Sequence, residues 1–162
     1  MEKQILKELN NFLGKAALAT YAGGGGEVDP EEPGFKELGF REGKWRYRDS
    51  YTGFFQSFGQ ETVWLKSKPF WTQIYGGGME KNFRSNTKFS HQTFAFLKKA
   101  MSAGEKQKKF QPRGPKKFAS GAWEYICQWQ GDIIKFKGRE KILFKKKIVF
   151  THDFLGGLVI PG

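Results

Sequence analysis

Two stretches of the chain carry apolar side chains at helical spacing. In the first, within residues 4–19, the apolar positions follow one stripe of a helix, and they are Ile5, Leu6, Leu9, Phe12, Leu13, Ala16 and Ala17. In the second, Phe94, Leu97 and Met101 are spaced i, i+3 and i+7. Ser90 is a candidate N-cap and Gly104 a candidate end for this second helix. The pattern therefore predicts two helices.

The residues that follow each helical stretch have the two-residue period of β-strands. Between Trp123 and Trp129 apolar and polar side chains alternate, which is typical of a strand with one buried face. Trp123, Tyr125, Cys127 and Trp129 share one face of this strand. The only cysteine thus lies among aromatic rings, where a thiol is usually a buried apolar group with a raised pKa. We expect no catalytic role for it.

The two halves of the chain align with each other. At an offset of 78 residues Trp45 falls on Trp123 and Tyr47 on Tyr125, and after one insertion Glu61 falls on Glu140. We therefore expect a single domain over residues 1–162, built from repeat units at about 1–80 and 81–162. The expected fold is α+β: two tandem helix-plus-three-strand repeats that form an antiparallel sheet or half-barrel with pseudo-twofold symmetry, with the helices packed against it. Residues 22–39 and 104–117 are expected to be connecting loops.

Composition excludes several classes of protein. Hydrophobic residues make up 38% and charged residues 27% of the 162 positions, which is unlike a disordered chain or a membrane protein. One cysteine and two histidines, His91 and His152, are too few for a typical zinc site, so we expect no metal and no cofactor. The charged residues at the N-terminus do not resemble a secretion signal, and we expect a cytoplasmic protein with no membrane partner.

Positive charge is concentrated in the second half of the chain. Residues 1–80 hold 10 Lys and Arg against 11 Asp and Glu, whereas residues 81–162 hold 18 against 5. Lys135, Lys137, Arg139 and Lys141 alternate with other residues, so one strand would present four cations on one face at spacings of ~6.6–6.8 Å. Such a row attracts polyanions. The alternative is a lysine-rich surface that only keeps the protein in solution.

Nucleic acid is the partner that this charge favours first. The residues expected to bind it are Lys135, Lys137, Arg139, Lys141, Arg113, Lys116 and Lys117. Our first hypothesis is a non-enzymatic binding domain that holds an anionic partner, most simply nucleic acid, through its basic C-terminal half. The oligomeric state stays open.

Three carboxylates fall on the apolar sides of expected strands. Asp49 shares a face with Tyr47 and Tyr51, while Glu61 and Glu140 align across the two halves. Such groups either hold the fold through hydrogen bonds or face a cleft. The alternative function is therefore small-molecule sensing in an aromatic cleft, lined by Asp49, Tyr51, Glu61, Trp71, Trp129 and Glu140. A third hypothesis is a hydrolase that uses the two glutamates as acid and base.

The run Gly23 to Gly26 does not favour a phosphate-binding loop. A P-loop needs Lys and then Ser or Thr after its last glycine, whereas here Glu27, Val28 and Asp29 follow. A flexible turn is the better interpretation.

The order of several motifs resembles a family of uncharacterised bacterial and archaeal domains, found alone or behind a helix-turn-helix regulator. The residues that carry the resemblance are Ala19 to Glu27, Trp45 to Tyr51, Gly59 to Glu61, Arg113 to Pro115, Gly131-Asp132, Gly138 to Glu140 and Gly156 to Val159. Members usually have a histidine before the closing Gly-Gly, where this sequence has Leu155. The resemblance implies a ligand-sensing or interaction module, and it brings no catalytic residues with it.

Overall fold

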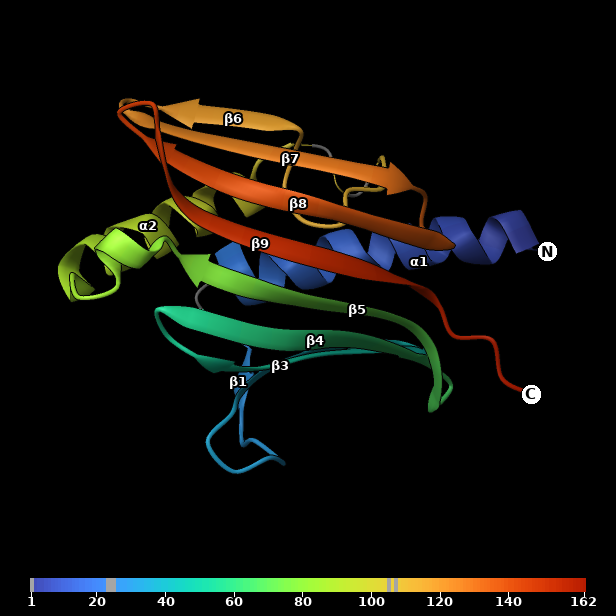
Figure 1. The fold of residues 1–162 in the computed structure, drawn as a ribbon. Helices are drawn as coiled ribbons and strands as arrows, with labels where there is room; N and C mark the ends of the chain where they lie inside the picture. The colour runs from blue at the N-terminus through green and yellow to red at the C-terminus, as the bar shows by residue number, and fades with distance from the viewer. Residues whose placement is uncertain (1, 23–25, 105, 107) are drawn as a thin grey trace.

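The computed structural model describes residues 2–22, 26–104, 106 and 108–162. Two helices, α1 (Glu2–Ala17) and α2 (Thr87–Ser102), lie on the same face of one large sheet (Figure 1). A π-helical turn, η1 (Leu18–Ala22), extends α1 and contacts α2, and a short 3-10 turn, η2 (Lys81–Phe83), precedes α2. Gly23, Gly24 and Gly25, which the sequence suggested as a flexible turn, lie outside the described residues.

The described residues form a sheet of nine strands in which every neighbouring pair is antiparallel. The strands are β1 (Glu27–Val28), β2 (Lys36–Glu42), β3 (Trp45–Gly53), β4 (Gln56–Leu65), β5 (Lys68–Met79), β6 (Lys117–Ser120), β7 (Trp123–Gly131), β8 (Lys135–Phe144) and β9 (Lys147–Leu158). Their order across the sheet is β1-β2-β3-β4-β5-β9-β8-β7-β6. The two halves of the chain therefore join where β5 pairs with β9, with Tyr75 opposite Phe154.

This architecture corrects the expected fold. The chain does not form two helix-plus-three-strand units; it forms one open, sheet-dominated fold in which both halves share a continuous sheet. The expected loop over residues 22–39 contains β1 and the start of β2, which pairs along β3, whereas the expected loop over residues 104–117 ends where β6 begins and pairs along β7. The backbone N–H and C=O groups along the outer edges of β3 and β7 need hydrogen-bond partners. The segments that pair with them therefore form strands although their own apolar pattern is weak.

The apolar stripes of both helices pack against the aromatic face of the sheet. Leu9, Phe12 and Leu13 of α1 are buried. Phe12 stacks on Trp45 with ring centroids 5.8 Å apart. On α2, Phe96 stacks in the same way on Trp123, at 5.5 Å. These contacts form the core, which lies between the helices and the sheet.

The N-terminus of α2 differs in detail from the expected one. Asn86 is the N-cap, because its side-chain oxygen accepts a hydrogen bond from the Phe89 backbone N–H at 3.0 Å. Ser90 lies one turn inside the helix and donates its hydroxyl to the Asn86 carbonyl at 2.9 Å. The helix ends at Ser102, close to the expected Gly104.

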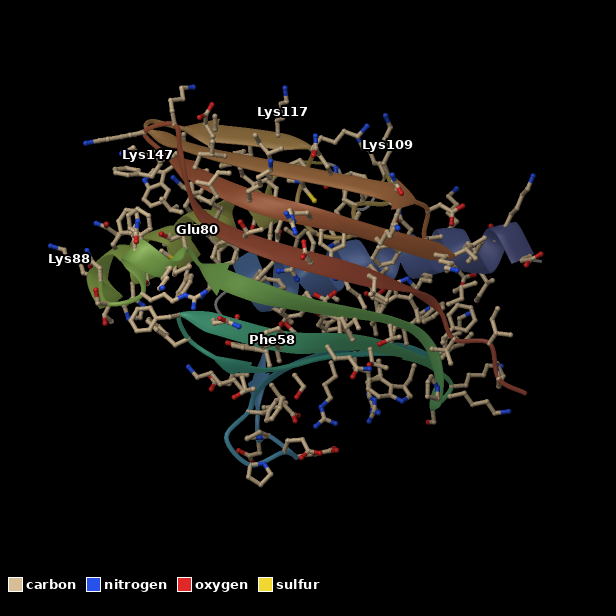
Figure 2. The ribbon with its side chains drawn as sticks, viewed as in Figure 1. Phe58, Glu80, Lys88, Lys109, Lys117 and Lys147 are labelled. Carbon is tan, nitrogen blue, oxygen red and sulfur yellow. The ribbon has the colours of Figure 1, made fainter. Side chains whose placement is uncertain are left out.

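On the opposite face of the sheet, which we call the helix-free face, the described residues form no helix (Figure 1). Three apolar side chains there are strongly exposed: Phe58 at 56%, Ile74 at 46% and Leu155 at 55%. Figure 2 shows Phe58 on the β4 half, with Lys117 and Lys147 at the other end of the sheet. No helix within the described residues combines the length and apolar character needed to cross a membrane.

Candidate functional site

A buried carboxylate on β8 is the centre of a polar network inside the core. Glu140 is fully buried, and its Oε1 accepts hydrogen bonds from Nε and Nη2 of Arg113, each at 2.9 Å. His152 Nδ1 lies 3.0 Å from the same oxygen, and the Tyr125 hydroxyl donates to Oε2 at 2.6 Å. Three side chains, from β7, β9 and the loop that follows α2, are thus fixed around one glutamate.

A second glutamate, on β4, has a comparable setting. The Tyr47 hydroxyl donates to Glu61 Oε1 at 2.9 Å, and the Gln73 amide donates to Oε2 at 2.5 Å. Arg113 Nη1 lies 3.9 Å from Glu61 Oε1. One buried guanidinium therefore stands between the two glutamates and offsets charge on both.

The third carboxylate, Asp49, lies opposite Glu61 in the β3–β4 register. Its two oxygens accept hydrogen bonds from Tyr21, at 2.7 Å, and Tyr75, at 2.8 Å. Burial, reinforced by the negative charge of Glu61, raises the pKa of Asp49 to about 7. This carboxyl therefore holds its proton more tightly than an exposed aspartate does.

The pKa of Glu140 is shifted in the opposite direction from that of Asp49. Burial opposes its ionisation, but Arg113 and His152 outweigh that effect and lower the pKa of Glu140 to about 2. Burial also lowers the pKa of His152, so that its neutral form is favoured at neutral pH. An ionised Glu140 can only accept hydrogen bonds, so the neutral imidazole of His152 must carry its proton on Nδ1. Its other nitrogen, Nε2, then keeps a lone pair and is an acceptor.

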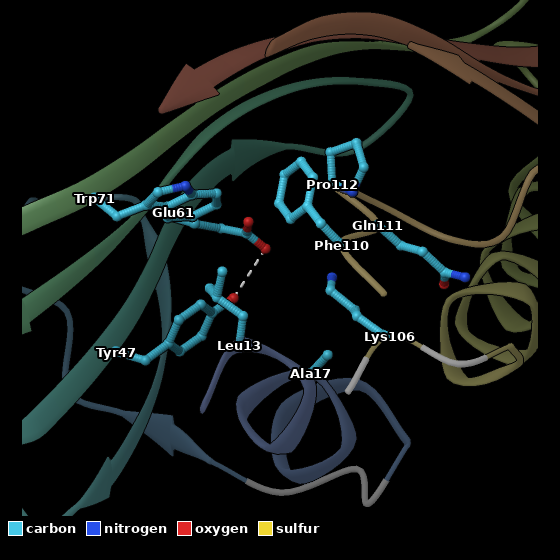
Figure 3. A pocket seen from close by; sticks show the side chains of 9 residues that line it. All are labelled: Leu13, Ala17, Tyr47, Glu61, Trp71, Lys106, Phe110, Gln111 and Pro112. Atoms are coloured by element: carbon cyan, nitrogen blue, oxygen red, sulfur yellow. Dashed lines mark hydrogen bonds between the residues drawn. The ribbon is translucent and has the colours of Figure 1, made fainter. Parts of the chain in front are cut away.

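A small void lies between α1, the sheet and the loop that follows α2 (Figure 3). Its volume is about 10 Å³, which is close to the space that one water molecule needs. Lys106 and Glu61 both line it, together with Trp71. Burial lowers the pKa of Lys106, whose Nζ donates to the Arg113 carbonyl at 3.4 Å. This void is too small for an organic ligand.

A much larger cavity opens beside α2, and we call it the α2 cavity. Its volume is about 420 Å³. It is lined by Tyr21, Lys36, Tyr51, Gly53, Phe54, Ser57, Tyr75, His91, Phe94, Ala95, Leu97, Lys98, Arg113, Phe150 and His152. The aromatic side chains form its walls, and Arg113 and His152 connect it to the buried network.

Two buried nitrogen atoms in this lining have no hydrogen-bond partner in the described part of the chain. They are Arg113 Nη1 and His152 Nε2. Both residues are more than nine-tenths buried, with 2% and 4% of their surfaces exposed. A buried polar atom without a partner is costly, so each of these atoms indicates a place where a water molecule or a ligand atom completes the site.

The structure gathers most of the residues expected in a ligand cleft. Asp49, Glu61 and Glu140 all point into the polar network from the helix-facing side of the sheet. Tyr51 lines the α2 cavity, whereas Trp71 lines the small void and donates its Nε1–H to the Ile133 carbonyl at 3.1 Å.

Trp129 lies apart from this group. It is half-buried under Lys116, whose Nζ is 5.8 Å from the ring centroid, and it lines neither the void nor the α2 cavity.

The residues expected to bind nucleic acid divide into separate groups. Lys135, Lys137 and Arg139 are exposed on the helix-free face, and Lys141 is half-buried beside them. Arg139 is paired with Asp153, with Nε 2.5 Å from Oδ1. Lys116 and Lys117 are exposed near the β6 edge.

The structure corrects one member of the expected nucleic-acid-binding set, Arg113. It is buried beneath α2 and hydrogen bonded to Glu140, so it is not part of an exposed basic surface. A sequence shows the charge of an arginine but not the buried carboxylate that receives it.

Sequence reasoning missed several members of the network, among them Tyr21, Gln73 and His152. The offset of 79 residues that relates Glu61 to Glu140 also relates Gln73 to His152, and this signal was available in the sequence. For Tyr21 there was no comparable signal, because its partner Asp49 is 28 residues away and is reached only through the folded chain. In the described part of the chain no three His, Cys, Asp or Glu side chains are grouped to hold a metal ion.

Comparison with known proteins gives one result. A family model described as a domain of unknown function, DUF5680, matches residues 49–159. The resemblance to an uncharacterised domain family is thereby confirmed at that level. Searches of curated proteins and of solved structures found no match.

Proposed function

The chain belongs to the DUF5680 family, and from the site described above we propose that this domain binds a small organic molecule in the α2 cavity. A volume of about 420 Å³ is within the range of known small-molecule sites, which span roughly 300–1,000 Å³. Such sites combine apolar walls with a few placed polar groups. The cavity has aromatic walls and a polar inner end formed by Arg113 and His152.

The pair of unpartnered nitrogen atoms at that inner end is the observation that supports this proposal most strongly. His152 Nε2 is free to accept, Arg113 Nη1 makes no hydrogen bond although it lies 3.9 Å from Glu61 Oε1, and both side chains are held in place by Glu140. A site whose polar groups are fixed before binding loses little entropy when a ligand arrives. The fixed pair therefore favours recognition of a specific molecule over nonspecific adsorption.

Binding is favoured over catalysis by the state of the carboxylates. Glu61 and Glu140 are buried, and tyrosine, amide, imidazole and guanidinium groups already occupy their oxygens. Neither glutamate is presented to the α2 cavity as a free acid or base. An acid and base pair for hydrolysis needs both groups within reach of a substrate.

An uncharged fluorescent dye, phenylnaphthylamine, provides the test. Its emission should rise on binding to the native protein, and Ala95→Trp should weaken this binding at least about tenfold because the indole obstructs the cavity. Ala95 is exposed on α2, so the fold should tolerate the change. Leu155→Ser on the helix-free face is the control, since it removes an exposed apolar side chain elsewhere. Binding that depends on Leu155 and ignores Ala95 would contradict the proposal.

A second candidate function is nucleic-acid binding by the helix-free face. The observation that favours it is the exposure of Lys135 and Lys137, for which the described residues provide no ion-pair partner within 4 Å. Replacing Lys135, Lys137 and Lys141 with Gln should weaken binding of a single-stranded oligonucleotide and reduce its salt dependence. Lys3→Gln with Lys7→Gln on α1 is the control for charge alone. Equal losses in both variants would point to net charge and not to a site.

The resemblance noted in the sequence also implies an association with helix-turn-helix regulators, and that stays a prediction. Under the present proposal this domain would be the part of such a regulator that senses the ligand.

A further inference from the structure

We infer that the molecule held in the α2 cavity is an anion with a flat apolar body, such as an aromatic acid, and that Lys36 and Lys98 receive its charge. This inference rests on the proposed function and identifies the chemical class of its ligand. Lys36 lies at the start of β2 and Lys98 lies in α2, so two different elements each bring a lysine to the lining of the cavity.

The charge of the lining has one sign. Lys36, Lys98 and Arg113 are cationic, and no Asp or Glu is present among the described residues that line the cavity. Both lysines are exposed, and the described acidic side chains form no ion pair with either of them. Two cations that approach one cavity without a counter-ion attract an anion into it.

Nearby carboxylates do not cancel this charge. Glu140 is paired with Arg113 at 2.9 Å, and burial raises the pKa of Asp49 to about 7, so that this carboxyl is partly protonated at neutral pH. Neither Glu140 nor Asp49 is among the residues that line the cavity. The charge of Arg113 is used by the two glutamates, so the anionic group of the ligand is best placed at the outer end, near the lysines.

The walls favour a flat body. Phe54 makes edge-to-face contacts with Phe94, with ring centroids 5.2 Å apart, and with His91, at 5.1 Å. Tyr51 and Phe150 add two more rings to the lining. Rings in these orientations offer faces and edges to another aromatic system. The inner end is left with a neutral acceptor, His152 Nε2, to which a hydroxyl or amide N–H of the ligand can donate.

Two dyes of matched shape test the charge of the ligand. Anilinonaphthalene sulfonate carries a sulfonate on the same ring system as the uncharged phenylnaphthylamine. At low ionic strength the sulfonate should bind the native protein about tenfold more tightly than the neutral dye. Lys36→Gln with Lys98→Gln should remove most of that advantage, because it should weaken the sulfonate far more than the neutral dye. Lys3→Gln with Lys7→Gln is the control for net charge.

The outcomes separate this inference from the function on which it rests. If the two dyes bind the native protein equally, or if the double variant weakens both dyes alike, the inference about charge fails while cavity binding stands. If Ala95→Trp affects neither dye, the proposed function fails and the inference fails with it. Loss of the sulfonate advantage in the Lys3 and Lys7 variant would also overturn it, because the effect would then come from net charge.

Discussion

His152 Nδ1 lies 3.0 Å from Glu140 Oε1, and this contact links the buried network to the α2 cavity. The ionised glutamate holds the proton of the imidazole on Nδ1, which leaves Nε2 as an acceptor. Glu140 on β8 does not line the α2 cavity, yet it determines that a ligand at the inner end of the cavity meets a hydrogen-bond acceptor. In the same way Glu140 fixes Arg113.

Removal of the Glu140 charge should destabilise the fold severely. Glu140→Gln leaves the guanidinium of Arg113 without its nearest counter-ion inside the core. Breaking a buried ion pair by removing one partner typically costs about 3–5 kcal/mol. Urea denaturation measures this loss. Glu124→Gln is the control, because its partner Lys146 is 83% exposed and such a pair contributes less than about 1 kcal/mol. Similar losses in the two variants would show that Glu140 is not the centre of the network.

The raised pKa of Asp49 predicts a stability that falls with rising pH. Between the ordinary value of 3.8 and the folded value of about 7, the folded state retains a proton that the unfolded state has lost. Stability from this group is therefore full below pH 3.8 and is lost as the pH rises toward 7, by up to about 4 kcal/mol.

Comparison with Asp49→Asn isolates this effect. Glu140 and His152 are present in both proteins, so their own titrations cancel in the difference. The difference in unfolding free energy, measured by urea titration between about pH 4 and pH 8, should shift in favour of Asp49→Asn as the pH rises. A difference that does not vary with pH would mean that Asp49 is ionised throughout.

The sequence predicted the faces of the elements better than their number. Alternation correctly placed Tyr125 and Cys127 on the buried side of β7 and the carboxylates of Glu61 and Glu140 on the core side. It missed β2 because Lys36, Glu37 and Gly39 interrupt its apolar pattern, and the buried Glu37 is held by an ion pair with Arg48 and a hydrogen bond from the Glu31 backbone N–H. Such pairings depend on the folded chain, and a linear pattern does not record them.

The candidate site was only partly accessible to sequence reasoning. Its carboxylates were identified because they fall on apolar faces, which is unusual for charged residues. The α2 cavity was not identified, because Lys36 of β2, Phe54 of the β3–β4 turn and Lys98 of α2 are far apart in the sequence and no local pattern specifies their arrangement. Arg113 was placed on the surface for the same reason.

Gly59 should be intolerant of any side chain. A Cβ at this position would lie 2.4 Å from the hydroxyl oxygen of Tyr75, which donates to Asp49 and lines the cavity. Gly59→Ala should cost about 1–3 kcal/mol, as overpacked cores do, and should weaken dye binding as well. Gly39→Ala is the matched strand control, because its Cβ would make an ordinary contact of 3.4 Å with Val28. Thermal unfolding and dye titration measure both effects, and an unchanged Gly59→Ala protein would contradict the packing described.

Cys127 should report on the opening of β7. Its thiol is 1% exposed, and burial beside the negative charge of Glu140 raises its pKa to about 12. Compared with an ordinary thiol of pKa ~8.5–9, the thiolate fraction at neutral pH is lower by about a thousandfold, so a chromogenic disulfide reagent should react very slowly with the native protein. The rate should rise through the urea transition. Ser120→Cys in a Cys127→Ser background places an exposed thiol on β6 and should react at once. Fast native reaction at Cys127 would show that β7 separates from the core without global unfolding, and the network around Glu140 would then be less rigid than its hydrogen bonds imply.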